Sequence, residues 1–161
     1  MAEPVVRFRY DGAQLAEGVY GIVTAMAVTA ALADGSTDTV WMAVAAFGTA
    51  LALAMTHIYA YWIVESHGNG PHQGLRNLIH HQLPVLVGPA LIGAAMILAD
   101  ELGSSIVTAA ELAMWVGVVS LFLLGFRISR YSGRGYGPSI AIGLVDAAFG
   151  ALIVLIKIAV H

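Results

Sequence analysis

The sequence contains no cysteine, and only 11% of its 161 residues are charged. Without cysteine, the chain has neither disulfides nor thiolate metal sites. Soluble domains average about 25% charged residues, so this low charge, together with 59% hydrophobic residues, indicates an integral membrane protein. The net charge of −3 and the lack of a basic run argue against nucleic-acid binding.

Apolar segments long enough to cross a bilayer recur along the chain. A spanning helix needs about 20 mostly apolar residues. Five segments meet this requirement, at about 13–33, 41–65, 83–99, 106–126 and 139–160. The first contains an acid and is longer than the core of a typical signal peptide, so we interpret it as a span. The sequence therefore predicts an all-α integral membrane protein with one five-span domain, 1–161.

The basic residues predict the orientation of these spans. Cytoplasmic loops are enriched in lysine and arginine. Six arginines fall on one side of the predicted topology: Arg7, Arg9, Arg76, Arg127, Arg130 and Arg134. The other side has several acids and only Lys157, near the end of the chain. We therefore expect a cytoplasmic N-terminus, an outside C-terminus and a multi-pass location in a bacterial cytoplasmic membrane.

Ionisable residues inside the spans mark a candidate site. Glu17 lies in the first span, His57 in the second, Glu111 in the fourth and Asp146 near the middle of the fifth. Because a charged group in hydrocarbon costs several kcal/mol (about 3 on insertion scales), we interpret these four as candidates for transport and proton coupling. Alternatives remain open: Glu17 and Glu111 as interfacial carboxylates, and His57 as a hydrogen-bonded packing residue.

Two of these acids sit in a shared pattern. Residues 15–21 and 144–150 both read Leu-x-acid-x-x-aromatic-Gly, with Glu17 and Asp146 as the acids. The pattern suggests an internal correspondence between the first and last spans, although chance similarity in an Ala- and Gly-rich chain is an equal alternative.

The connection between the second and third spans is rich in histidine. Imidazole and carboxylate groups suit divalent first-row metals, and thioether sulfur is a soft ligand. The candidate metal ligands are Glu17, Met55, His57, Glu65, His67, His72, His80 and His81. Their spacing matches no fixed zinc motif, and a solvated polar loop is the alternative interpretation.

Three local expectations concern the ends and the interior of helices. Pro84 and Pro89 predict a kink in the third span. The turn residues at 36–39 offer caps for the second span. Near the end of the fourth span, three arginines beside tyrosines suggest contact with anionic lipid headgroups: Arg127, Arg130 and Arg134.

The chain resembles the vacuolar iron transporter family. The likeness rests on the five-span topology, on Glu17-Gly18 where that family has Asp-Gly, and on 121–133, LFLLGFRISRYSG, before the last span. Met55 lies near a methionine that the family uses. The glutamate that the family carries earlier in its second span is missing here, as is its Glu-rich cytoplasmic metal-binding domain.

The resemblance implies a transporter for a divalent metal such as Fe²⁺ or Mn²⁺, coupled to protons and acting as a homodimer. Only Glu17 and, less securely, Met55 map onto the family's functional positions. We expect Gly18, Gly21 and Ala25 to face a partner subunit, since small residues allow close helix contact. No resident cofactor and no enzyme activity are expected. The alternatives are a transport-inactive interaction or lipid-binding module and, less favoured, a haem or quinone subunit using His57.

Overall fold

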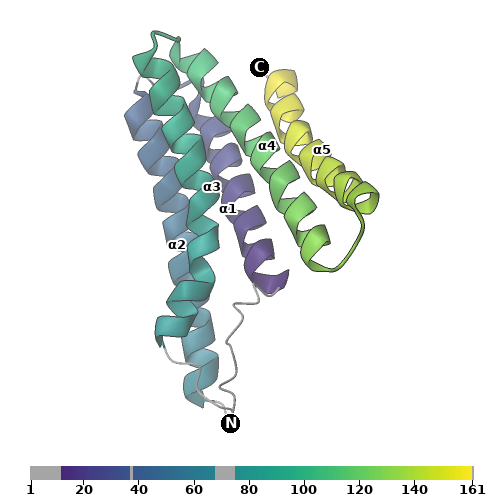
Figure 1. Cartoon of the computed structure of the whole chain (residues 1–161). Helices are drawn as coiled ribbons and strands as arrows, with labels where there is room; N and C mark the ends of the chain where they lie inside the picture. The colour runs from purple at the N-terminus through teal and green to yellow at the C-terminus, as the bar shows by residue number, and fades with distance from the viewer. Residues whose placement is uncertain (1–11, 37, 68–74, 161) are drawn as a thin grey trace.

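Over the described ranges, 12–36, 38–67 and 75–160, the computed structural model contains helices and turns but no strand (Figure 1). The helices are α1 (Gly12–Leu32), α2 (Thr39–His67), α3 (Leu75–Glu101), α4 (Ile106–Tyr131) and α5 (Tyr136–Val160). The predicted all-α fold is confirmed. Helices α2 to α5 are long and apolar enough to cross a membrane, whereas the apolar helix described in α1, Glu17–Leu32, is shorter.

Helix α3 begins well before its predicted span. Helix α3 begins at Leu75 rather than near residue 83, so His80 and His81 lie in a helix and not, as expected, in a loop. Hydropathy detects only the part of a helix that matches the bilayer core, whereas backbone hydrogen bonding carries the helix further. In Figure 1, α2 and α3 extend together beyond the nearby ends of α1 and α4.

Helix α1 occupies the centre of the bundle. It packs against α2, α3 and α4, whereas α5 packs mainly on α4 (Figure 1). Four methionines, one from each of α1 to α4, are fully buried in one apolar cluster: Met26, Met42, Met96 and Met114. Flexible thioether side chains fill the irregular space where four helices meet.

Glycine and proline bring α1 and α3 into backbone contact. A Cβ on Gly21 would collide with the carbonyl oxygen of Val85. Pro89 lacks the N–H that would donate to the Val85 carbonyl four residues earlier, so this oxygen is available to the Cα–H of Gly21, a weak hydrogen-bond donor. The two prolines lie within a continuous helix from Leu75 to Glu101.

This contact corrects the expected dimer surface. Gly18 and Gly21 pack against α3 and α4, and Ala25 is fully buried. The small-residue face of α1 is therefore occupied within one chain, and it is not the surface that a partner subunit would meet.

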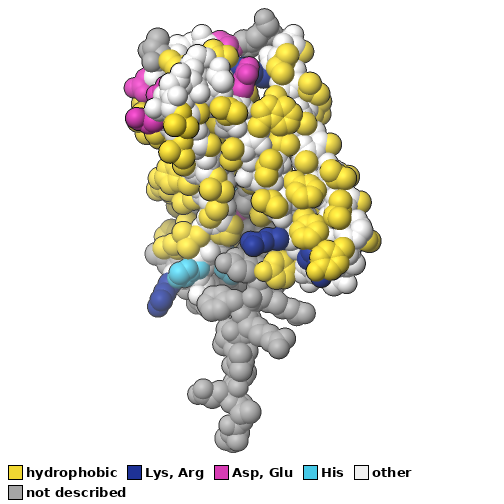
Figure 2. Space-filling model, turned by 45° about the horizontal axis from the view of Figure 1, so that its top comes forward, with side chains coloured by type: hydrophobic (Ala, Val, Ile, Leu, Met, Phe, Trp, Pro, Cys, Tyr) yellow, Lys and Arg dark blue, Asp and Glu magenta, His cyan; other side chains and the backbone are white. Residues whose placement is uncertain are grey.

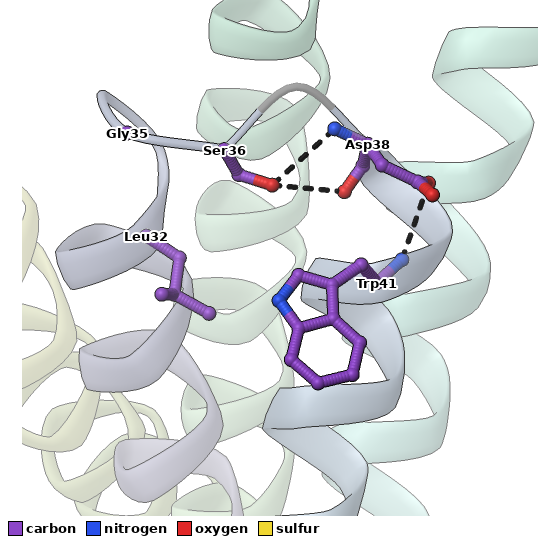
Figure 3. Close-up of a pocket in the computed structure, with 5 residues that line it drawn as sticks. All are labelled: Leu32, Gly35, Ser36, Asp38 and Trp41. Atoms are coloured by element: carbon purple, nitrogen blue, oxygen red, sulfur yellow. Dashed lines mark hydrogen bonds between the residues drawn. The ribbon is translucent and has the colours of Figure 1, made fainter.

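The α1–α2 turn is organised by its own side chains. Oδ1 of Asp38 accepts hydrogen bonds from the backbone N–H groups of Val40 (2.8 Å) and Trp41 (3.2 Å). Asp38 thus caps α2, as expected for this turn. The hollow between Leu32 and Trp41 (Figure 3) is lined by Ser36 and Asp38, whose polar atoms serve the turn. We assign this hollow no binding role.

A polar contact ties this turn to α3. The Thr39 hydroxyl donates a hydrogen bond of 2.6 Å to Oδ2 of Asp100, at the far end of α3. Thr39 is buried, so the start of α2 and the end of α3 are held together at this end of the bundle.

Charge separates the two ends of the bundle, with a hydrophobic band between them (Figure 2). We call one the acidic end, with Asp34, Asp38, Asp100 and Glu101, and the other the basic end, with Arg76, Arg127, Arg130 and Arg134. The buried Lys157 lies in the last turn of α5, near the acidic end.

Candidate functional site

The central feature is a contact between two of the predicted site residues. Nδ1 of His57 in α2 lies 3.0 Å from Oε2 of Glu17 in α1. The side chains are 31% and 16% exposed, respectively, so the pair is partly shielded from its surroundings. A proton between these two atoms completes a hydrogen bond. When both ring nitrogens of His57 carry a proton and Glu17 is ionised, the contact is an ion pair. Sequence reasoning named both residues but not their contact.

The antiparallel arrangement of α1 and α2 explains why the two residues meet. Both helices reach the same short turn at the acidic end, Glu17 being 15 residues before Leu32 and His57 18 residues after Thr39. At 1.5 Å per residue, these separations place both side chains at nearly equal depth. Equal depth on neighbouring helices is the condition for contact.

Aromatic residues of α2 lie between the pair and the basic end. Tyr59, Tyr61 and Trp62 are exposed, and the rings of Tyr59 and Trp62 lie 6.3 Å apart. Such aromatic groups are typical of the membrane–water interface. His57 precedes them by two to five residues, so it lies about 3 to 8 Å further from the basic end along α2. The pair is therefore near the basic end, just within the hydrophobic band.

Gln82 was missed as a site residue. Its side chain is only 4% exposed, and its Oε1 atom is buried without a hydrogen-bond partner. A buried amide oxygen without a partner costs about 1 to 3 kcal/mol. Gln82 is spaced by three, four or seven residues from the buried Leu78, Val85 and Pro89, as on one face of a helix. This spacing could have identified it, but the sequence predicted a loop as far as Gln82.

Met55 lies away from the pair. It is 62% exposed and separated from His57 by two residues, which turns it to a different face of α2. The structure does not bring Met55 together with Glu17, contrary to the expected ligand set.

Asp146 occupies a separate environment. Its Oδ2 atom lies where a Cβ on Gly125 of α4 would be. Leu124, the preceding residue of α4, is 3.2 Å from the Cβ position of Gly18 in α1. Among the described residues, Glu17 forms its ion pair with His57, and no hydrogen bond or ion pair joins it to Asp146.

The other predicted metal ligands are spread over the ends of α2 and α3. His80 is exposed and His81 half-buried on the first turns of α3. His72 lies outside the described residues, as do the side chains of Glu65 and His67. Within the described part of the chain, no three His, Asp or Glu side chains are grouped to hold a metal ion.

The remaining predicted residues lie near the surface. Glu111 is exposed in the second turn of α4. Arg127, Arg130 and Arg134 are exposed at the basic end. Arg130 lies 4.0 Å from the centre of the Tyr136 ring and donates a 2.8 Å hydrogen bond to the carbonyl of Arg134, so it fixes the α4–α5 turn.

Comparison of the chain with protein-family models, curated proteins and solved structures finds no match.

Proposed function

We propose that this protein is a five-span membrane transporter that exchanges a divalent metal ion, such as Fe²⁺ or Mn²⁺, for protons. The basic end faces the cytoplasm, in keeping with the enrichment of arginine in cytoplasmic segments. The Glu17–His57 pair is the binding site, reached from that side, and the likeness to the vacuolar iron transporter family supports the same class.

The observation that carries the proposal is the 3.0 Å separation of His57 Nδ1 and Glu17 Oε2. Two ligand atoms bound to one metal at about 2.1 Å, at right angles, lie about 3.0 Å apart. The proton that joins the two atoms and a metal ion that joins them therefore occupy the same place. Competition between them for one site is the basis of exchange.

The ligand types suit the substrate class. Imidazole nitrogen and carboxylate oxygen together bind Fe²⁺ and Mn²⁺, and open positions are filled by water or by further oxygen donors. Partial exposure of His57 gives an entering ion access, and the position near the basic end shortens its path from the cytoplasm.

The test is metal flux into proteoliposomes that contain a metal-sensitive dye, with a pH gradient across the bilayer. Mn²⁺ entry should rise when the destination compartment is the more acidic one. We expect Glu17→Gln and His57→Gln each to reduce the flux at least about tenfold. Glu101→Gln removes an exposed carboxyl at the acidic end and should leave the flux unchanged. Flux no greater than in protein-free vesicles would refute the proposal.

A second candidate function is a lipid-binding or interaction module on the same fold. It is favoured by the exposure of Arg127 and Arg134 beside Arg130, which is held over Tyr136. Anionic lipid retained by the purified protein, and lost in the Arg127→Gln, Arg134→Gln double variant, together with no metal flux, would favour this alternative.

A further inference from the structure

Resting on the proposed function, we infer that Gln82 is the third donor of the Glu17–His57 site and biases it towards a cation that accepts oxygen ligands, Mn²⁺ rather than Zn²⁺. Two facts motivate the inference. Gln82 is buried within the bundle, and its amide oxygen has no hydrogen-bond partner. The Glu17–His57 pair is an incomplete ligand set for a metal ion that takes four or more ligands.

The helix contacts define a reference layer for locating Gln82. Val85 of α3 is packed in one buried cluster with Ala54 of α2. The backbone of Val85 also meets Gly21 of α1. Val85 therefore lies against both helices that carry the pair, and we call Gly21, Ala54 and Val85 the reference layer.

From the reference layer, each helix reaches a polar residue after about one turn towards the basic end. Glu17 precedes Gly21 by four residues, Gln82 precedes Val85 by three, and His57 follows Ala54 by three because α2 runs in the opposite direction. These steps correspond to about 4.5 to 6 Å along each axis. The carboxylate, imidazole and amide thus share one depth.

The direction of each side chain agrees with this placement. Residues three or four apart lie on the same face of a helix. Gln82 shares the buried face of α3 with Val85. The low exposed fraction of the Glu17 side chain and its contact with His57 show that these two side chains also face inward. A second contact supports the common depth of Glu17 and Gln82. The carbonyl oxygen of Pro84 lies 3.6 Å from the Cβ position of Gly18, which is next to Glu17.

The chemistry of the amide sets the preference. A carboxamide oxygen is a neutral, hard donor of the kind found around Ca²⁺ and Mn²⁺, whereas Zn²⁺ favours nitrogen and sulfur ligands in a tetrahedral arrangement. Binding of a metal ion would also give the Gln82 oxygen the partner that it lacks.

The experiment titrates MnCl₂ and ZnCl₂ separately into the detergent-purified full chain, followed by calorimetry. Gln82→Leu should weaken Mn²⁺ binding at least about tenfold and Zn²⁺ binding less than about threefold, a tenfold change being about 1.4 kcal/mol. Gln82→Glu keeps an oxygen donor and adds charge, so it should tighten Mn²⁺ binding. Asn77→Leu, which removes an exposed amide from the same helix, is the matched control and should bind as the wild type does.

Several outcomes would overturn the inference, and they differ from failure of the proposed function. If Glu17→Gln abolishes Mn²⁺ binding while Gln82→Leu binds normally, the pair binds metal and Gln82 is not a donor. Equal weakening of Mn²⁺ and Zn²⁺ refutes the assigned preference. If Gln82→Leu does not fold, unchanged Mn²⁺ affinity in Gln82→Glu decides against a donor role. No Mn²⁺ binding by the wild type defeats both proposals.

Discussion

Glu17 and Asp146 occupy the same position in a shared sequence pattern, yet the bundle gives them different surroundings. Glu17 faces an imidazole on a neighbouring helix, at 3.0 Å. Asp146 lies against Gly125, where the missing side chain of α4 leaves room for its carboxyl group. The difference shows that the neighbouring helix, and not the shared local sequence, determines what each acid contacts.

The largest expected effect comes from adding a methyl group at the glycine of each helix contact, because backbone atoms move aside less easily than a side chain does. Gly21→Ala sets a Cβ against the carbonyl of Val85, which is backbone, whereas Gly125→Ala sets one against the side chain of Asp146. We expect Gly21→Ala to lower the free energy of unfolding by about 3 kcal/mol and Gly125→Ala by about 1 kcal/mol. Denaturation followed by circular dichroism in micelles measures both.

A second variant tests the assignment of the Gly125 contact. In an Asp146→Ala background, the effect of Gly125→Ala should fall below about 0.5 kcal/mol, since the colliding group is gone. Equal destabilisation by Gly125→Ala in both backgrounds would mean that the carboxyl group is not what fills this space.

A smaller effect is expected from breaking the Glu17–His57 contact. Glu17→Gln and His57→Gln should each lower stability by about 1 kcal/mol, because the pair is partly exposed and a charge-assisted hydrogen bond is weakened. A double-mutant cycle in micelles should give a coupling energy of about 0.5 to 1 kcal/mol. Strict additivity of the two changes would contradict a direct interaction.

The smallest effect is expected from removing the charge of Asp146. Asp146→Asn preserves the shape of the side chain beside Gly125, so we expect a stability change within about 0.5 kcal/mol and unchanged Mn²⁺ affinity by calorimetry. Glu17→Gln, the matched change in the other copy of the pattern, should lose Mn²⁺ binding. Equal loss in both variants would argue that the two acids serve one site.

Much of the fold follows from the sequence because bilayer thickness and apolar length are directly related. The helical class and the apolar segments were predicted in this way. A cap for α2 was predicted separately from the turn residues at 36–39, and Asp38 provides it. The start of α3 was not, because residues 75–82 are polar enough to read as a loop although they continue the helix. The neighbours of Gly21 could not be predicted from the sequence either, since a small-residue face fits a partner subunit as well as it fits α3.

The candidate site was predicted in part. The rarity of ionisable groups in apolar segments singled out Glu17 and His57. Their contact depends on the rotation of two helices, which composition does not specify. Met55 was included for its thioether and for the resemblance, neither of which specifies the face of α2 that it occupies. Gln82 carries no formal charge, so the argument from the rarity of charge passed over it, and only burial revealed its unpartnered oxygen.

The separation of Glu17 and His57 by 40 positions has a consequence for how the protein is made. Synthesis proceeds from the N-terminus, so Glu17 emerges from the ribosome before its partner exists. A lone ionisable group is unfavourable in hydrocarbon, and α1 gains its polar partner only when α2 has followed. If α1 crosses a bilayer, as we propose, its insertion is coupled to that of α2, and the first two helices enter most favourably as one hairpin.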